Sequence, residues 1–486
     1  MTARLTHLVH GRSQQQLTLM VVCLALFFNV LNGTMVNIAL PAIGRDFAIE
    51  PARLGWIATG YLLVFGVAVP FYGRLADRFG ARRLFVIGLC IYSVSSLGCA
   101  LAPSYPLLLL GRIAQASGAA SIAGLGMAII SGVYPPEKRG SALGYVSATV
   151  GSGAAVGPIV GGTITGLLNW HAMFLLSALS GLIVPVAMRV LPPSERRPGE
   201  GIDLLGGVLL GLGVGGALLA ATEGARGDIT APVVSAAATV SLLAFGLLVL
   251  RQRLTTSPFV PRALLHNGRF IALVVVSFCA MTANVATFVA LPLLLNRDYN
   301  LSEVQIGFVL LPNALAVATL GPVAGRLVDR IGGRLPLRVG LVVILTAQLA
   351  FSTVGVGNVV WFVSLLSAIQ GVGFALMNSP IATMVSLAVG RDRQSSGLSM
   401  NSMAFFLGGG FGTAMLTAIL TLRASAANGL NPLYVQDAIP YSDAFLIFSV
   451  PLLLALTLSL RLPSGEHQDE EWIPDRSTAP ARAPAR

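Results

Sequence analysis

The most constraining feature of this chain is a series of fourteen apolar stretches, each about 20 residues long and separated by short polar segments. A helix rising 1.5 Å per residue needs roughly 20 such residues to cross the ~30 Å hydrocarbon core of a bilayer. We therefore expect an all-α integral membrane protein with fourteen transmembrane helices. The predicted spans are 17–40, 54–73, 84–103, 105–126, 140–163, 171–191, 204–222, 231–250, 270–295, 305–325, 335–355, 359–380, 397–421 and 444–461.

Composition and charge support this assignment. Only 10% of the 486 residues are charged, whereas soluble domains carry about 25%. Most of the 31 basic residues fall in alternate predicted loops and in the two terminal tails. Because cytoplasmic loops are enriched in Lys and Arg, we expect both termini in the cytoplasm and the protein in a bacterial plasma (inner) membrane. Membrane orientation explains the net charge of +11, and the continuous basic patch of a nucleic-acid interface is not seen.

Residue types that carry most enzyme chemistry are sparse in this sequence. The four cysteines lie within apolar stretches without Cys-x-x-Cys spacing, and the five histidines do not cluster in the sequence. The Gly-x-x-x-x-Gly-Lys-Ser/Thr loop of ATP-binding proteins does not occur. We therefore expect no enzyme activity, no metal and no bound cofactor, and an ion gradient, most simply of protons, as the energy source.

The chain contains an internal repeat. The segment from Gly73 to Arg82 recurs from Gly325 to Arg334 with seven of ten positions identical. Parallel repeats mark transporters built from two similar halves. The predicted organisation is an N-terminal tail at 1–16, a six-helix bundle at 17–191, a two-helix insertion at 204–251, a second six-helix bundle at 269–461 and a disordered tail at 462–486.

Four motifs resemble those of a known family. The repeated loop matches Gly-x-Leu-Ala-Asp-Arg-x-Gly, and the fourth helix carries Arg112-Ile-Ala-Gln115-Ala-Ser-Gly118. The fifth helix has Gly144, Gly153, Gly157-Pro158 and Gly161-Gly162, and the first helix ends with a stretch from Leu31 to Pro41. Over roughly 17–461 the chain resembles the major facilitator superfamily in its fourteen-helix drug:proton antiporter branch.

The resemblance implies a fold and a function. It implies two six-helix bundles plus two extra central helices, acting as a monomer. It also implies efflux of small amphipathic drugs or antibiotics by alternating access, in exchange for protons. In the family the repeated loop latches one conformation, which assigns Gly73, Asp77, Arg78, Gly80, Arg82 and Asp329 to a latch. The first copy is the more constrained one, and the glycine-rich fifth helix seals the pathway between the halves.

Arg112 is the strongly charged residue that lies well inside a predicted helix, ~10 Å from its outer end. A buried arginine in a membrane costs several kcal/mol unless it is paired, so it is a functional hypothesis by default. Gln115 lies on the same helix face. The resemblance implies that Arg112, with Asp77 and Gln115, takes part in proton or substrate coupling.

Polar side chains inside the predicted helices are candidates for lining a central cavity of mixed apolar and hydrogen-bonding character. Each is equally explained by an interhelical hydrogen bond. The candidates are Asn29, Asn32, Asn37, Thr282, Asn284, Gln370, Asn378 and Asn401.

The chain departs from the drug antiporters at Asn32, where many members of that branch have an aspartate. All 20 acidic residues map to loops, tails or helix ends, and an asparagine cannot titrate. Protons can instead use Asp77 or a helix-end acid such as Asp443, and His171 is a further titratable candidate. The alternative is a dedicated exporter of one neutral or anionic metabolite with weak or no proton coupling.

Overall fold

The computed structural model describes residues 2–49, 51–193, 203–224, 231–256, 258–301, 303–355, 359–389, 393–424, 426, 428–434 and 438–462. The predicted tail beyond 462 and the side chain of Pro158 lie outside this set. Within it, fourteen helices are long and apolar enough to cross a membrane. Each of them overlaps one predicted span, so the fourteen-helix prediction is confirmed.

The spans of the first block are α1 to α7, with α6, the 3-10 segment η1 and α7 forming one span. Their bounds are α1 (Thr2–Asp46), α2 (Pro51–Phe79), α3 (Ala81–Ala100), α4 (Tyr105–Val133), α5 (Pro136–Leu167), α6 (Trp170–Ala178), η1 (Leu179–Leu182) and α7 (Ile183–Val190). A hairpin follows, made of α8 (Leu204–Gly224) and α9 (Pro232–Leu254). We call α1–α7 the N-terminal block.

The C-terminal block begins after the short α10 (Arg262–Leu265), and its α13 continues into the π-helical segment η2. Its bounds are α11 (Gly268–Tyr299), α12 (Glu303–Ile331), α13 (Arg334–Ala350), η2 (Phe351–Gly355), α14 (Val360–Ala388), α15 (Gln394–Leu422) and α16 (Ile439–Leu460).

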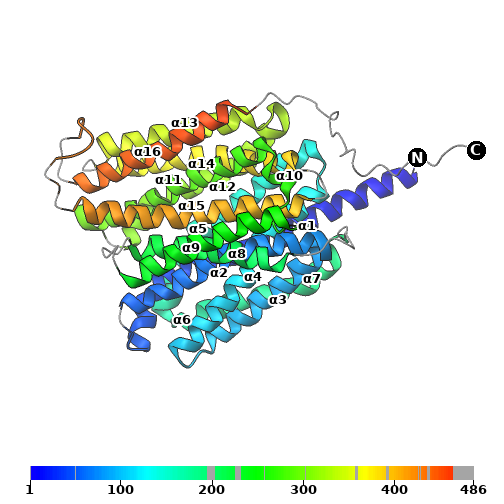
Figure 1. Ribbon diagram of the computed structural model, residues 1–486, viewed down its shortest axis with the longest axis horizontal. Coiled ribbons are helices and arrows are strands. Elements are labelled where there is room, and N and C mark those ends of the chain that lie inside the picture. Colours follow the sequence, from blue (N-terminus) through cyan, green and yellow to red (C-terminus); the bar gives the residue numbers. More distant parts are fainter. Residues whose placement is uncertain are drawn as a thin grey trace, which may run out of the picture.

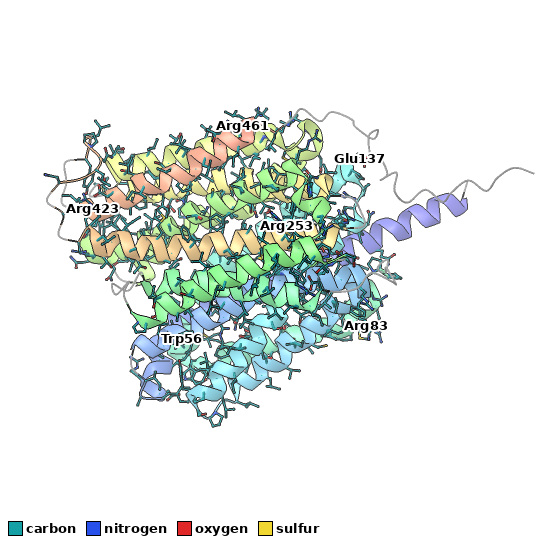
Figure 2. All side chains as sticks on the ribbon, in the orientation of Figure 1. Trp56, Arg83, Glu137, Arg253, Arg423 and Arg461 are labelled. Carbon is teal, nitrogen blue, oxygen red and sulfur yellow. The ribbon has the colours of Figure 1, made fainter. Side chains whose placement is uncertain are left out.

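Helix α1 begins and helix α16 ends on the same side of the bundle, at the right in Figure 1. We call this side the terminal face and the opposite side the distal face. Helix α1 already begins at Thr2, so the predicted tail at 1–16 continues the first membrane span, which starts at Gln14. Among the side chains labelled in Figure 2, Arg83 and Glu137 lie at the terminal face and Arg423 at the distal face.

The hairpin packs between the two blocks. On α8, Gly207 lies against Phe71 and Gly211 against Val67, both on α2, while Leu218 lies against Gly410 on α15. Because glycine has no side chain, α8 can approach α2 closely, as helices with small residues do at interfaces in membranes. The predicted insertion is therefore attached to both halves, along the line where α2 meets α15 (Figure 1).

One buried carboxylate ties the two helices of the hairpin together. Asp203 accepts a hydrogen bond from the Gly206 backbone N–H at 2.9 Å and so caps α8. The same carboxylate accepts a 2.6 Å bond from Arg251 Nε at the end of α9.

The side chains that face outward are apolar, as a bilayer requires. Leu182 is 72% exposed and Leu242 is 74% exposed. Inside, one core cluster around Met35, Ile57 and Phe174 lies toward the distal face, and all its buried members come from the N-terminal block. At this end the two blocks therefore have separate cores.

Candidate functional site

Arg112 is the centre of a buried polar network in the N-terminal block. Its side chain is 2% exposed and lies on α4, the most thoroughly buried of the fourteen spans. Its Nη1 donates to Asn32 Oδ1 on α1 at 2.8 Å and to Gln115 Oε1 on α4. The sequence predicted Arg112 and Asn32 as separate candidates, and the structure brings them into direct contact.

The network continues through neutral groups. Asn32 Nδ2 donates to Ser177 Oγ at 2.7 Å on α6, and Gln115 Nε2 donates to Ser96 Oγ at 2.6 Å on α3. In this way Arg112 joins four helices of the N-terminal block through uncharged partners. Its Nε is buried and has no hydrogen-bond partner among the described residues.

Aromatic rings enclose the guanidinium. The Arg112 Cζ lies 4.1 Å from the centroid of the Tyr61 ring and 5.9 Å from that of Phe174. A cation over an aromatic face is attracted by the ring quadrupole, more strongly when it is desolvated. The hydroxyl of Tyr61 in turn donates to Asn29 Oδ1 at 3.1 Å.

The other predicted cavity residues have different surroundings. Asn37 is exposed, Asn284 and Asn378 are half-buried, and Thr282 bonds the Phe278 carbonyl of its own helix at 2.9 Å. Asn378 Nδ2 donates to Ser147 Oγ at 3.0 Å, which joins the C-terminal block to the N-terminal block. Gln370 is buried, and Asn401 is buried with an Oδ1 that has no partner among the described residues.

At the terminal face, the two copies of the repeated loop each contact the opposite block. Asp77 on α2 accepts a bond from Ser396 Oγ in the first turn of α15. Asp329 on α12 accepts from the backbone N–H groups of Gly140 at 2.7 Å and Ser141 at 2.8 Å, near the start of α5. A carboxylate near a helix N-terminus also interacts favourably with the helix dipole.

Glycines in each copy of the repeat allow it to approach the helix of the opposite block, α15 for the first copy and α5 for the second. A Cβ at Gly73 would lie 2.5 Å from Ser399 Cβ on α15, and a Cβ at Gly325 would lie 2.9 Å from Ser141 Cα on α5. Gly80 and Gly332 take positive φ angles of 90° and 79° at the turns that follow, a backbone conformation that glycine adopts without steric cost. Each loop copy therefore holds the start of a helix in the other block.

The remaining latch candidates act locally. The Arg78 guanidinium lies 5.5 Å from the Phe79 ring centroid, and Arg82 Nη2 donates to the Met188 carbonyl at the end of α7. Both contacts stay within the N-terminal block. Among the residues of the two loop copies, the described contacts that cross between the blocks are made by Gly73, Asp77, Gly325 and Asp329.

The glycine motif of α5 is divided between two interfaces. Gly144 lies against the backbone of Gly321 on α12, in the other block. Gly153, Gly157 and Gly161 instead pack against α1 of their own block, at Val30, Thr34 and Met35. A Cβ at Gly162 would meet nothing within 4 Å. The predicted seal between the halves therefore includes Gly144 but not the later glycines.

The contacts between blocks reach from the terminal face to the midpoints of the helices. The deepest of those described are Gly151 of α5 against Val317 of α12 and Gly66 of α2 against Leu407 of α15. All four residues lie near the midpoints of their helices. In this structure the blocks are thus closed together on the terminal side.

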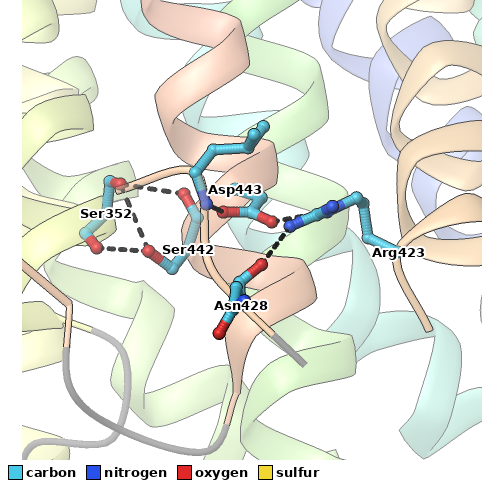
Figure 3. A network of polar contacts seen from close by, with 6 residues as sticks. Ser352, Arg423, Asn428, Ser442 and Asp443 are labelled. Carbon is cyan, nitrogen blue, oxygen red and sulfur yellow. Dashed lines mark hydrogen bonds and ion pairs between the residues drawn. The ribbon is translucent and has the colours of Figure 1, made fainter. Parts of the chain in front are cut away.

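Two further titratable candidates lie at the distal face. Asp443 is completely buried and accepts bonds from Arg423 Nε at 2.7 Å and from the Leu430 backbone N–H at 2.6 Å (Figure 3). It therefore connects α15, the following loop and α16 within one block. His171 stacks on Trp170 with ring centroids 3.6 Å apart.

Residues 22–413 match the sequence pattern of the Major Facilitator Superfamily. This chain belongs to the major facilitator superfamily. It is 30% identical over 444 residues to the multidrug resistance protein Stp of Mycobacterium tuberculosis, covering 88% of this chain and 79% of Stp. It is 27% identical over 457 residues to the riboflavin transporter RibZ of Clostridioides difficile, covering 91% and 97%.

A solved member of the superfamily shares the fold. The crystal structure of the human organic anion transporter MFSD10 superposes with a TM-score of 0.69 at 15% identity, covering 92% of this chain and 99% of that protein. The chain is thus a multi-pass membrane protein of a transporter superfamily, which agrees with the resemblance in the repeated loop and in α4 and α5.

Some residues of this site were not predicted from the sequence. Tyr61 and Phe174 enclose Arg112, and Ser96 and Ser177 complete its network, but none belongs to a motif. Asp46 and Trp170 join α1 to α6 at the distal face by a 2.8 Å hydrogen bond. Serine and aromatic residues are common in transmembrane helices. Those that contact Arg112 differ from the others only in the direction in which the side chain points, and the sequence does not show this direction.

The latch geometry predicts that the second loop copy matters as much as the first. Asp329→Asn removes a charge-assisted acceptor from two backbone N–H groups, a loss of about 2 kcal/mol for the closed terminal face. We expect transport to fall by about thirtyfold, as in Asp77→Asn. The measurement is the initial transport rate in cells at matched protein levels. The control is Glu137→Gln, an exposed carboxylate in the first turn of α5, which should transport at the unmodified rate.

Proposed function

We propose that this protein is a secondary active exporter of small amphipathic compounds that works by alternating access. In this proposal it lies in the bacterial inner membrane as a monomer, with the terminal face in the cytoplasm, so the structure corresponds to its outward-facing state. The observation that carries the proposal is the paired latch, in which Asp77 and Asp329 each hold a helix start of the opposite block. Such contacts break and re-form when two rigid blocks rock about a shared interface.

Proton exchange is part of the leading proposal. The acidic side chains described within the spans all lie near helix ends, and among them we take Asp77 at the terminal side and Asp443 at the distal side as proton-carrying candidates. Asp77 is the better candidate because its hydrogen bond to Ser396 crosses between the blocks and so depends on the conformation. Asp443 pairs within one block, which favours a structural role.

A second candidate is a dedicated exporter of one neutral or anionic metabolite with weak or no proton coupling. The contact between Asn32 and Arg112 favours it, because a neutral amide lies where a carboxylate would neutralise the arginine and attract a cation. RibZ, which carries riboflavin by its name, shows that a relative of this length is associated with a vitamin. The name of Stp supports the multidrug reading.

Substrate accumulation in bacteria that lack their main efflux pumps tests the proposal. Cells with and without the protein receive ethidium, a neutral antibiotic or an anionic dye, each with and without a protonophore. We expect lower accumulation of at least one compound, and a loss of this difference in Asp77→Asn. Abolition by the protonophore supports proton exchange, whereas persistence supports the second candidate. Equal accumulation of every compound, with the protein confirmed in the membrane, would contradict export.

A further inference from the structure

Arg112 has a buried positive charge that no acidic side chain pairs with among the described residues. Its described partners are Asn32, Gln115 and two aromatic rings, all of them uncharged. Charged side chains buried in membrane proteins are normally paired, and an unpaired one indicates a substrate or ion site. An anionic ligand would supply the compensating charge that the described residues do not.

The free edge of the guanidinium defines the geometry of that anion. Both hydrogen bonds to described residues come from Nη1, and Nε is buried without a partner. The edge formed by Nε and Nη2 is one at which arginine binds a carboxylate, phosphate or sulfonate with two parallel hydrogen bonds. The protein thus holds the guanidinium through Nη1 and leaves the buried Nε without a hydrogen-bond partner among the described residues.

A row of aromatic rings leads from Arg112 across the boundary between the blocks. Tyr61, on which Arg112 stacks, lies 6.0 Å from Phe65, and Phe65 lies 4.4 Å from Phe406 on α15. Phe406 is 5.3 Å from Phe405, which is 6.4 Å from Phe374 on α14. We call these five residues the aromatic row. The three rings in the C-terminal block are half-buried, and the contact between Phe65 and Phe406 joins α2 to α15.

A second unpartnered polar atom lies beside this row. Asn401 is 5% exposed, and its Oδ1 is buried without a partner among the described residues. It precedes Phe405 by four residues on α15, so the two side chains share a face of that helix. Buried polar atoms are almost always hydrogen-bonded in folded proteins, so this oxygen is an acceptor for a ligand donor or for water.

We infer that the protein binds an organic anion that carries a flat aromatic ring system, with the anionic group on the free edge of Arg112 and the rings along the aromatic row. This inference rests on the proposed transport function and names its substrate class. It also gives Asn32 a role, because the amide positions the guanidinium without cancelling its charge. A cationic substrate would meet an uncompensated positive charge here.

Binding of two dyes with the same ring system separates this inference from the transport proposal. Fluorescein is an anion at pH 8, whereas rhodamine 123 has a closely similar xanthene ring system and is a cation. Fluorescence anisotropy with the full-length protein purified in detergent gives both dissociation constants without any transport. We expect fluorescein to bind at least about tenfold more tightly than rhodamine 123, as one charge-assisted contact would provide.

Variants assign this preference to Arg112. Arg112→Gln should weaken fluorescein binding at least about tenfold. Arg112→Lys should bind fluorescein more tightly than Arg112→Gln but more weakly than the unmodified protein, because lysine keeps the charge and lacks the planar guanidinium. Leu242→Ala, at an exposed lipid-facing position of α9, is the control and should bind as the unmodified protein does. Any variant that does not elute as a folded monomer is set aside, and the comparison of the two dyes on the unmodified protein decides the question.

The outcomes distinguish the anion site from the transport proposal. Equal or tighter binding of rhodamine 123, or unchanged fluorescein affinity in folded Arg112→Gln, would overturn the anion site even if the protein exports ethidium from cells. Fluorescein binding that depends on Arg112, together with no export of any compound, would retain the site and remove the transport proposal.

Discussion

Gly144→Ala is expected to reduce transport at least tenfold, whereas Gly162→Ala, in the same motif and the same helix, is expected to leave it unchanged. A Cβ at Gly144 would enter the van der Waals shell of the Gly321 carbonyl oxygen and lie 3.1 Å from Gly325 Cα. These are backbone atoms of α12, so only a separation of the two helices can relieve the clash. Overpacking of this kind costs about 1–3 kcal/mol, which is roughly a 5- to 150-fold shift in an equilibrium, and a clash with backbone atoms belongs in the upper part of this range.

This clash acts on one conformation only. The atoms that crowd Gly144 belong to α12 in the other block, so the alanine should disfavour the closed terminal face without disturbing the N-terminal block. A protein that cannot close this face cannot complete an alternating-access cycle.

Two measurements on matched variants test the glycine prediction. The first is the initial transport rate of Gly144→Ala and Gly162→Ala at equal protein levels. The second is maleimide labelling of Ser147→Cys, placed at the contact with Asn378 between the blocks, in a background without the four native cysteines. Labelling should be faster in Gly144→Ala. Transport by Gly144→Ala at the unmodified rate would show that this close approach is not needed.

The spacing of the glycines in the α5 motif predicts that they contact two different helices. Gly153 follows Gly144 by nine residues, and at 100° per residue this places it on the opposite side of the helix. Gly157 and Gly161 then continue along the second face at intervals of four. The motif therefore had to contact two different neighbours, although the sequence alone does not say that they are α12 and α1.

The membrane spans were predictable because each depends on a local property, the length of an apolar stretch, and not on contacts with other helices. The corresponding positions of Asp77 and Asp329 were predictable from the repeat, because the same ten-residue pattern recurs in both blocks. The resemblance gave the second copy less weight, and its contacts with the start of α5 do not support that difference.

The network around Arg112 could not be predicted in the same way. Its partners come from α1, α2, α3 and α6, and each contact depends on how a helix is rotated about its axis. Rotation is set by packing against neighbouring helices, and the apolar faces toward lipid and toward protein look alike in sequence. The polar candidates could therefore be named from the sequence, but not which of them lie together.

Asn32→Asp should have the second large effect and remove the charge preference of the site. The aspartate would place a carboxylate at the position where Asn32 Oδ1 now accepts from Arg112 Nη1 at 2.8 Å. The resulting ion pair would satisfy the arginine internally and compete with any bound anion. We expect fluorescein affinity to fall at least about tenfold and the preference over rhodamine 123 to disappear.

The same dye pair measures this change, and Asn37→Asp provides the matched control. Asn37 lies on the same helix but is exposed, so an aspartate there adds the same charge to α1 without reaching Arg112. A similar loss of fluorescein binding in both variants would mean that general electrostatics, and not the contact with Arg112, sets the preference. A loss confined to Asn32→Asp would show that the neutral amide keeps the arginine free for its ligand, and that one substitution in the first helix separates anion from cation recognition in this scaffold.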